Sequence, residues 1–296
     1  MPAPVAADHW ALVAALHAWG DGVRPDLPWR RDRRPWAVLV SEAMLQQTQV
    51  ARVAPRFTAF LARWPDPAAL AADPLADVLE AWAGLGYYRR ARDLHAAARA
   101  IVARHGGEVP DDLAALRALP GVGPYTARAV LALAFGRDVG VVDTNAARVL
   151  SRAFAGAPLT ASAVQRLADA LVPSGTGRAH TEAVLDLGAT VCTARAPRCD
   201  VCPLARGCAW RGAGGDAPDP AATTAGTSRP QARFEGSDRQ GRGRLLAALR
   251  TGPVRRADLA AAAGWPDDPD RAARVADGLV ADGLAARRGG RLVPPP

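Results

Sequence analysis

One short stretch decides the fold: Leu119-Pro120-Gly121-Val122-Gly123-Pro124. A short predicted helix at residues 112–118 runs into it, and a longer helix that begins at Pro124 leaves it. The two glycines, Gly121 and Gly123, permit a hairpin tight enough for its backbone N–H groups to point outward together. Such groups at a helix N-terminus bind a phosphate without reading base sequence. The stretch therefore predicts a helix-hairpin-helix element that binds DNA, and an ordinary connection between two helices is the alternative.

The residues around this stretch also have a helical pattern. Apolar side chains recur on one helical face after Pro124. A second run with this spacing follows Thr144 and consists of Ala146, Val149, Leu150, Ala153 and Phe154. Runs that alternate apolar and polar residues, as strands do, are scarce before Trp210. Residues 1–211 are therefore predicted to be all-helical.

The composition changes after Arg211. Residues 212–240 begin with Gly, Ala, Pro, Thr and Asp, which offer little to form a core, so we expect a flexible linker there. Helical periodicity returns in residues 241–296, and Gly289-Gly290 between two short segments predicts a hairpin. Three helices followed by a basic hairpin predict a small winged-helix-like domain.

The positive charge of the chain comes from arginine alone. Its 296 residues include 37 basic and 29 acidic ones, a net charge of +8, and no lysine. The lack of lysine excludes a mechanism that needs a lysine nucleophile or Schiff base. A GC-rich genome accounts for arginine in place of lysine, but it does not account for the net positive charge. That charge favours a polyanionic partner, whose phosphates guanidinium groups bind bidentately.

All four cysteines lie in one short loop, at Cys192, Cys199, Cys202 and Cys208. Four thiolates at this spacing can bind a tetrahedral zinc ion or a [4Fe–4S] cube, and the spacing does not separate the two. Clustered thiols suit a reducing cytoplasm. Residues 1–7 show no signal-peptide pattern, and no uncharged apolar run approaches ~18 residues. We therefore expect a cytoplasmic protein without a membrane span.

Two carboxyl groups have contrasting surroundings. Asp143 directly precedes the helix that begins at Thr144, and the helix N-terminus should lower its pKa and keep it ionised; the alternative is a helix N-cap alone. Glu42 lies between the apolar runs 37–40 and 43–45, which should raise its pKa if the helix is buried; the alternative is a solvated residue. A neutral acid and an ionised stabiliser form the pair that glycosidic cleavage uses.

The hairpin stretch, the segment Val141-Val142-Asp143-Thr144-Asn145 and the cysteine loop together resemble the endonuclease III superfamily of helix-hairpin-helix DNA glycosylases. Three more stretches resemble its adenine DNA glycosylase (MutY-type) branch. They are Leu27-Pro28-Trp29-Arg30, the run Ser-Glu-Ala-Met-Leu-Gln-Gln-Thr-Gln-Val at residues 41–50, and Gly84-Leu85-Gly86-Tyr87-Tyr88. The resemblance covers residues 8–210. It implies a two-lobed all-α fold, with a six-helix barrel at about 23–133 and a cluster domain made of 1–22 and 134–211.

The resemblance also implies a cofactor and catalytic roles. The four cysteines would hold a [4Fe–4S] cluster. Glu42 would protonate the adenine, Asp143 would stabilise the oxocarbenium-like sugar, and Asn145 would orient the catalytic carboxylates. Tyr125 stands where the lyases of the superfamily carry a catalytic lysine, which implies a monofunctional glycosylase.

The binding residues follow from the same resemblance. Adenine-pocket positions fall on Trp29, Arg30 and Asp186, the last of which is usually Glu in the family. Residues that enter the duplex around the mispair fall on Leu45, Gln47, Thr48 and Tyr87, and the polar run 46–49 suits that role. Gly121 and Gly123 belong to the hairpin that contacts the DNA backbone.

The implied activity is base-excision repair of adenine mispaired with 8-oxoguanine or guanine in double-stranded DNA, by a monomer associated with the nucleoid. The C-terminus departs from the family, because the roughly 55 residues beyond Arg242 are too few for the Nudix-like domain that reads 8-oxoguanine in many members. Residues 233–237 would either contact the oxidised base or fix the linker.

Two other functions stay open at this point. A thymine or uracil mismatch glycosylase of the same superfamily is disfavoured by the Gln-Gln-Thr run after Glu42. A non-catalytic DNA-binding regulator with the cluster as a redox sensor is disfavoured by the presence of both Glu42 and Asp143.

Overall fold

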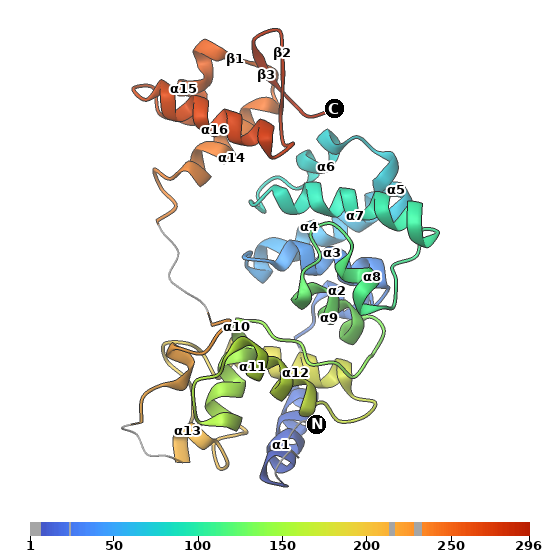
Figure 1. Ribbon diagram of the computed structural model, residues 1–296, viewed down its shortest axis with the longest axis vertical. Coiled ribbons are helices and arrows are strands. Elements are labelled where there is room, and N and C mark those ends of the chain that lie inside the picture. Colours follow the sequence, from blue (N-terminus) through green and yellow to red (C-terminus); the bar gives the residue numbers. More distant parts are fainter. Residues whose placement is uncertain (1–6, 24, 213–216, 228–232) are drawn as a thin grey trace. The chain divides into compact units, whose positions relative to one another are not determined.

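The structure is a computed structural model that describes residues 7–23, 25–212, 217–227 and 233–296. The chain forms two compact units (Figure 1). Unit 1 consists of residues 1–38, 111–117 and 122–229, and unit 2 of residues 39–110, 118–121 and 230–296. The domain boundaries expected from the sequence stay a prediction. The stretch that argued against a signal peptide lies, apart from Ala7, outside the described residues.

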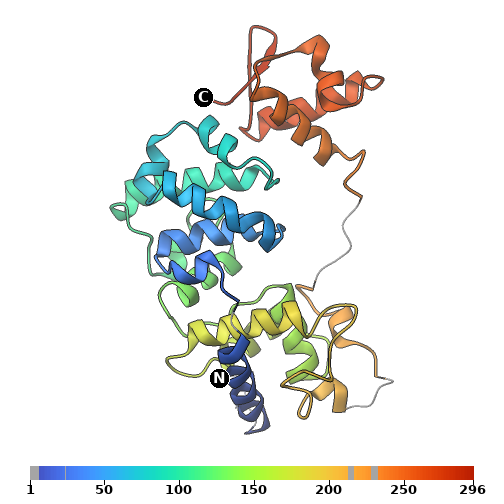
Figure 2. The ribbon, with the colours of Figure 1, turned by 180° about the vertical axis from the view of Figure 1, so that it is seen from behind.

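Unit 1 contains only helical elements in its described residues. They are α1 (Ala7–Val23), α2 (Pro28–Arg31), the start of α3 (Pro35–Leu45), α8 (Leu113–Arg117), α9 (Pro124–Leu133), α10 (Thr144–Val149), a π-helical turn (Leu150–Ala155), α11 (Ala161–Ala170), α12 (Gly177–Thr190), α13 (Ala209–Gly212) and a 3₁₀ turn (Pro220–Ala222). Both α1 and α10 pack against α12, as the two opposite views show (Figures 1 and 2). The five apolar residues expected on one face after Thr144 are all buried in this core, which confirms that prediction.

The hairpin between α8 and α9 has the predicted outline, but its two glycines serve different purposes. Gly121 has a φ of +73°, and a Cβ there would lie 2.6 Å from the Cβ of Asp93, so only glycine fits. Gly123 is the N-cap of α9 with an ordinary φ of −83°, and nothing lies within 4 Å of the place where its Cβ would be. The second glycine therefore leaves the N-terminus of α9 uncovered rather than forming a left-handed turn.

Unit 2 combines a helical part with the C-terminal segment. The helical part holds the rest of α3, then α4 (Val50–Arg63), α5 (Pro67–Ala72), α6 (Leu75–Ala81) and α7 (Arg89–His105). The C-terminal segment contains α14 (Asp238–Leu249), β1 (Val254–Arg255), a 3₁₀ turn (Arg256–Asp258), α15 (Leu259–Ala263), α16 (Pro269–Ala281), β2 (Ala286–Arg288) and β3 (Arg291–Val293). Its antiparallel sheet has the order β1-β3-β2, and Gly289-Gly290 form the hairpin turn with positive φ at both residues. The expected helices and basic hairpin are present, while membership of the winged-helix class stays a prediction.

The predicted flexible linker is wrong in part. Residues 217–227 include a 3₁₀ turn that Asp219 caps, and Ala221 and Thr224 are buried. Helix α14 already begins at Asp238, inside the range assigned to the linker. Composition misled here because polar contacts to other parts of unit 1, among them the pair of Asp219 with Arg152, hold this segment in place of a large apolar core. Residues 213–216 and 228–232 lie outside the described chain.

No helix within the described ranges is both long enough and apolar enough to cross a lipid bilayer.

The close approach of α12 to α10 can be tested at Gly188. A Cβ at this position would lie 2.6 Å from the Cβ of Asn145 and 2.9 Å from its backbone oxygen, so α10 would have to move. Overpacking of this kind costs ~1–3 kcal/mol, and we expect Gly188→Ala to lower the free energy of unfolding by that amount in a urea titration. The control is Gly22→Ala in α1, where the new Cβ meets no atom within 4 Å. An equal loss in both variants would contradict the packing explanation.

Candidate active site and cluster loop

Asp143 is the N-cap of α10. Its Oδ1 accepts hydrogen bonds from the backbone N–H groups of Asn145 (2.8 Å) and Ala146 (2.7 Å), and its Oδ2 accepts one from Nδ2 of Asn145 (2.9 Å). These three hydrogen bonds therefore both cap α10 and fix the orientation of the Asp143 carboxylate.

The expected lowering of the pKa of Asp143 is wrong. Burial raises the pKa of this carboxyl above its ordinary value of 3.8, and the hydrogen bonds from Ala146 and Asn145 offset the effect only in part. The helix N-terminus favours the ionised form, but the loss of water on burial outweighs it. The consequence is a carboxylate fixed in low-dielectric surroundings, where its charge acts strongly on positive charge that develops nearby.

Arg148 connects this carboxylate to the cysteine loop. Its Nη2 donates to Oδ1 of Asn145 (2.8 Å), which leaves the amide nitrogen of Asn145 facing Asp143. Its Nε donates to the carbonyl oxygen of Cys192 (2.6 Å). Sequence reasoning missed Arg148, although its place three residues after Asn145 on one helix put both side chains on the same face.

Glu42 lies in α3, in unit 2, and is 5% exposed. A solvated helix-face position is therefore excluded. Tyr125 is the second residue of α9 and packs beside the buried Ala129, Ala132 and Val141 of unit 1. The two candidate carboxyl groups, Glu42 and Asp143, belong to different units.

The predicted adenine-pocket residues come from α2 and α12 of unit 1. Arg30 donates from both terminal nitrogens to the carboxylate of Asp186 (2.9 and 2.7 Å), and Trp29 beside it is buried. Glu182, one turn before Asp186, is 3% exposed. Its Oε1 lies 2.5 Å from Arg33 and 3.9 Å from Arg30, although neither ion pair is aligned as a hydrogen bond. Glu182 and Arg33 were not predicted from the sequence, although the i, i+4 spacing of Glu182 and Asp186 places both carboxylates on one face of α12.

Gln47 and Tyr87 share an unusual backbone. Among the residues that the structure describes, these are the non-glycine positions with positive φ, at +56° and +48°. Such conformations cost on the order of 1–3 kcal/mol each, and they are typical of functional sites. Both side chains are exposed. Leu45, which ends α3, and Thr48 are half-buried beside them.

Arg90 holds the turns that carry these two residues. Its Nη1 donates to the carbonyl oxygens of Ala43, Met44 and Gln46, at 2.8, 2.8 and 2.6 Å. Its Nη2 donates to the hydroxyl of Thr48 (3.0 Å) and to the carbonyl oxygens of Leu85 (3.1 Å) and Gly86 (3.0 Å). Burial lowers the pKa of Arg90 to about 10, so the group stays charged at neutral pH. Sequence reasoning did not identify this residue.

The four cysteines line one pocket of unit 1, together with apolar residues of α12 and of the loop itself. None of them forms a disulfide. Four thiols that line one shared pocket fit a [4Fe–4S] cube held at its corners. Burial raises the pKa of the Cys202 thiol to about 11, so loading the loop displaces protons.

Two known families match this chain. The HhH-GPD superfamily of base excision DNA repair proteins matches residues 40–174, and the iron-sulfur binding domain of endonuclease III matches residues 192–208. The second match falls on the four cysteines, so the loop binds a [4Fe–4S] cluster and not zinc.

Known relatives cover most of the chain. The adenine DNA glycosylase of Mycolicibacterium smegmatis is 47% identical over 275 residues, which are 91% of this chain and 90% of the relative. That of Mycobacterium tuberculosis is 47% identical over 283 residues, 92% of this chain and 89% of the relative. A solved thermostable thymine-DNA glycosylase superposes with a TM-score of 0.65 at 29% identity, and covers 70% of this chain and 98% of its own.

The superfamily match includes Glu42, the hairpin and Asp143, and the higher identity to adenine-specific relatives decides between adenine and thymine. This chain belongs to the adenine DNA glycosylases of the HhH-GPD superfamily, the N-glycosylases of base-excision DNA repair.

Proposed function

We propose that Glu42 and Asp143 divide the excision of adenine between them. The enzyme extrudes the adenine from the duplex, at a cost of a few kcal/mol that is smallest at a mispair. Glu42 delivers a proton to the purine ring, which makes the base a better leaving group. The C1′–N9 bond then breaks with oxocarbenium character, Asp143 stabilises the positive charge, and water adds to leave an abasic site. The observation that carries this proposal is the burial of Asp143 together with its three fixed donors.

The pocket for the extruded base is assigned to α2 and α12. Trp29 offers a flat apolar face, while Arg30 and the acidic pair Asp186 and Glu182 offer donors and acceptors for the base edge. The departure from Glu to Asp at position 186 is accommodated here because Arg30 spans the gap to the shorter side chain bidentately.

The C-terminal segment is assigned to the base opposite the adenine. One pocket of unit 2 is lined by the turns around Gln47 and Tyr87 and also by Phe234, Arg239 and Arg242 of the C-terminal segment. Nη1 of Arg239 donates to the hydroxyl of Tyr87 (3.1 Å).

Asp282 supports this arrangement, because its carboxylate accepts from Arg89 of α7 (2.6 Å) and from Arg242 of α14, and its backbone oxygen accepts from Arg92. Recognition of 8-oxoguanine would then depend on this segment.

The enzyme acts on chromosomal DNA in the cytoplasm.

The roles of the two carboxyl groups are tested in single turnovers. Glu42→Gln and Asp143→Asn should each slow the release of adenine by several orders of magnitude while mispair binding is retained, because both residues act on charge that appears only in the transition state. The raised pKa of Asp143 also predicts that the rate falls on acidification at a higher pH than an ordinary aspartate would give, since the protonated acid stabilises no cation. The exposed Glu80→Gln is the control. A wild-type rate in either variant would remove that residue from the mechanism.

The enzyme should not cut the DNA chain. Without lysine and with Tyr125 in α9, no side-chain amine is present to form a Schiff base with the abasic sugar. We expect borohydride to trap little covalent adduct, and strand breaks to appear only after alkali. Efficient trapping would contradict a monofunctional enzyme and would point to the N-terminal amine.

Arg90→Met should release both strained turns. The variant loses six hydrogen bonds, and we expect it to bind mispaired DNA at least tenfold more weakly, with a smaller loss for undamaged duplex. Arg99→Met, an exposed position on the same helix, is the control. Equal losses for both duplexes, measured by titration of labelled DNA, would contradict a role in mispair contacts.

The opposite-base assignment is tested by comparing excision of adenine opposite 8-oxoguanine and opposite guanine. We expect Arg239→Gln and Asp282→Asn to reduce the ratio of the two rates, while the rate opposite guanine changes little because the catalytic residues lie elsewhere. Asp267→Asn, on the exposed side of the C-terminal segment, should leave the ratio unchanged. A wild-type ratio in both test variants would reduce the C-terminal segment to a structural cap.

A further inference from the structure

The residues that follow the last cysteine pack onto the π-helical turn Leu150–Ala155. We call residues 217–227 the cluster strap. The hydroxyl of Thr224 accepts from the backbone N–H of Leu159 (3.2 Å) and donates to the carbonyl of Pro220 (2.8 Å), and the N–H of Ala225 donates to the carbonyl of Leu159 (2.9 Å). The strap is therefore a folded part of unit 1 and lies against the helix that leads from the active site to the cysteine loop.

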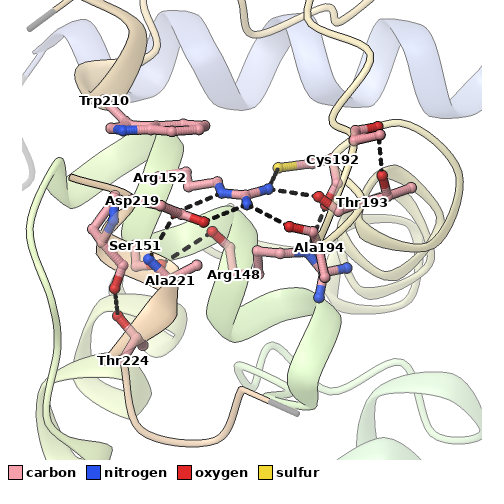
Figure 3. A network of polar contacts seen from close by, with 12 residues as sticks. Arg148, Ser151, Arg152, Cys192, Thr193, Ala194, Trp210, Asp219, Ala221 and Thr224 are labelled. Atoms are coloured by element: carbon pink, nitrogen blue, oxygen red, sulfur yellow. Dashed lines mark hydrogen bonds and ion pairs between the residues drawn. The ribbon is translucent and has the colours of Figure 1, made fainter. Parts of the chain in front are cut away.

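Arg152, inside the π-helical turn, joins the strap to the cysteine loop, and Figure 3 shows its guanidinium surrounded by acceptors. Nε and Nη2 donate to the two carboxylate oxygens of Asp219 (2.9 and 2.6 Å). Nη1 donates to the carbonyl of Thr193 (2.7 Å) and to Sγ of Cys192 (3.6 Å), and Nη2 also donates to the carbonyl of Ala194 (3.1 Å). These contacts use all five N–H donors of the group.

The charge of Arg152 is fixed next to two cluster ligands. The residue is 2% exposed, its guanidinium carbon lies 4.8 Å from the ring centre of Trp210, and its backbone oxygen lies 3.4 Å from Sγ of Cys208. Burial works against the charged form, but the hydrogen bonds to Asp219 and Cys192 outweigh it and raise the pKa of Arg152. A buried cation needs a partner of opposite charge, and among the described contacts of Arg152 the carboxylate of Asp219 supplies it.

We propose that the Arg152–Asp219 pair sets the reduction potential of the cluster. Hydrogen bonds to cysteine sulfur and the local net charge are two of the main determinants of such potentials. Arg152 supplies a hydrogen bond and positive charge at Cys192, which favours the more reduced cluster. Asp219 holds the guanidinium in place and partly neutralises it. Asp219 thus acts on the cluster both by positioning Arg152 and by opposing its charge, and the inference rests on the cysteine loop and not on the catalytic roles proposed above.

The test measures the potential of the cluster-loaded protein by voltammetry, with iron content and visible absorption recorded for each variant. Asp219→Asn should shift the potential in the positive direction, because the cation is less neutralised. Arg152→Gln should shift it in the negative direction. In the Arg152→Gln background, Asp219→Asn should shift the potential further in the positive direction than in the wild type, since no guanidinium is loosened there to offset the removed charge.

Asp200→Asn is the matched control, because it removes the same charge from an exposed position between Cys199 and Cys202. Its shift should be small and equal in both backgrounds. Arg152→Lys keeps the positive charge but lacks the planar guanidinium with its paired N–H donors. Its potential should therefore lie between those of the wild type and Arg152→Gln.

Three results would overturn the proposal. The first is a shift of equal size for Asp219→Asn with and without Arg152, and the second is a shift of the same sign for Asp219→Asn and Arg152→Gln. The third is one common potential for the wild type and both Arg152 variants, which would exclude the proposal even if Asp219→Asn failed to retain iron.

Discussion

Guanidinium groups buried against backbone carbonyl oxygens determine much of this structure. Arg90 gathers the carbonyls at the end of α3 and in the turn before α7, Arg148 joins Asn145 to the carbonyl of Cys192, and Arg152 gathers the carbonyls of Thr193 and Ala194. A carbonyl taken out of water without a donor costs free energy. A single arginine can satisfy several such groups and still carry its charge. In each of the three places, irregular backbone that carries proposed functional residues is held by one long side chain from a helix.

This arrangement explains why the candidate carboxylate and the cysteine loop share a scaffold. Asp143 caps α10, Asn145 and Arg148 follow on that helix, and Arg152 follows in the π-helical turn. The same short segment therefore presents a carboxylate at its beginning and two guanidinium groups to the cysteine loop further on. Because α10 crosses α12 at Gly188 without room for a Cβ, close packing against α12 also fixes the position of the segment.

Much of this could be predicted from the sequence, and the failures have physical causes. The hairpin, the helix after Thr144 and the cysteine loop are local patterns, so spacing and side-chain type were enough to identify them. The pKa of Asp143 was predicted in the wrong direction because burial depends on packing that no local pattern contains. Arg152 and Glu182 were missed because their charged partners, Asp219 and Arg33, are distant in sequence. Most acceptors of Arg90 are also distant from it in sequence. The strap was taken for linker because Asp219 is stabilised by one long-range ion pair, and composition carries no trace of such a contact.

If the turns around Gln47 and Tyr87 enter the duplex as proposed, their positive φ angles have a consequence for how the protein searches DNA. Both turns already have their unusual shape in the free protein and are held there by Arg90. Little conformational entropy remains to be lost by these turns when they meet a duplex, which is the general benefit of preorganisation. The protein side of the encounter is then nearly the same at every base step, and the difference between steps comes from how readily the DNA itself unstacks and bends. Under that proposal, the preformed turns respond to how easily the duplex deforms before any base is recognised by hydrogen bonding.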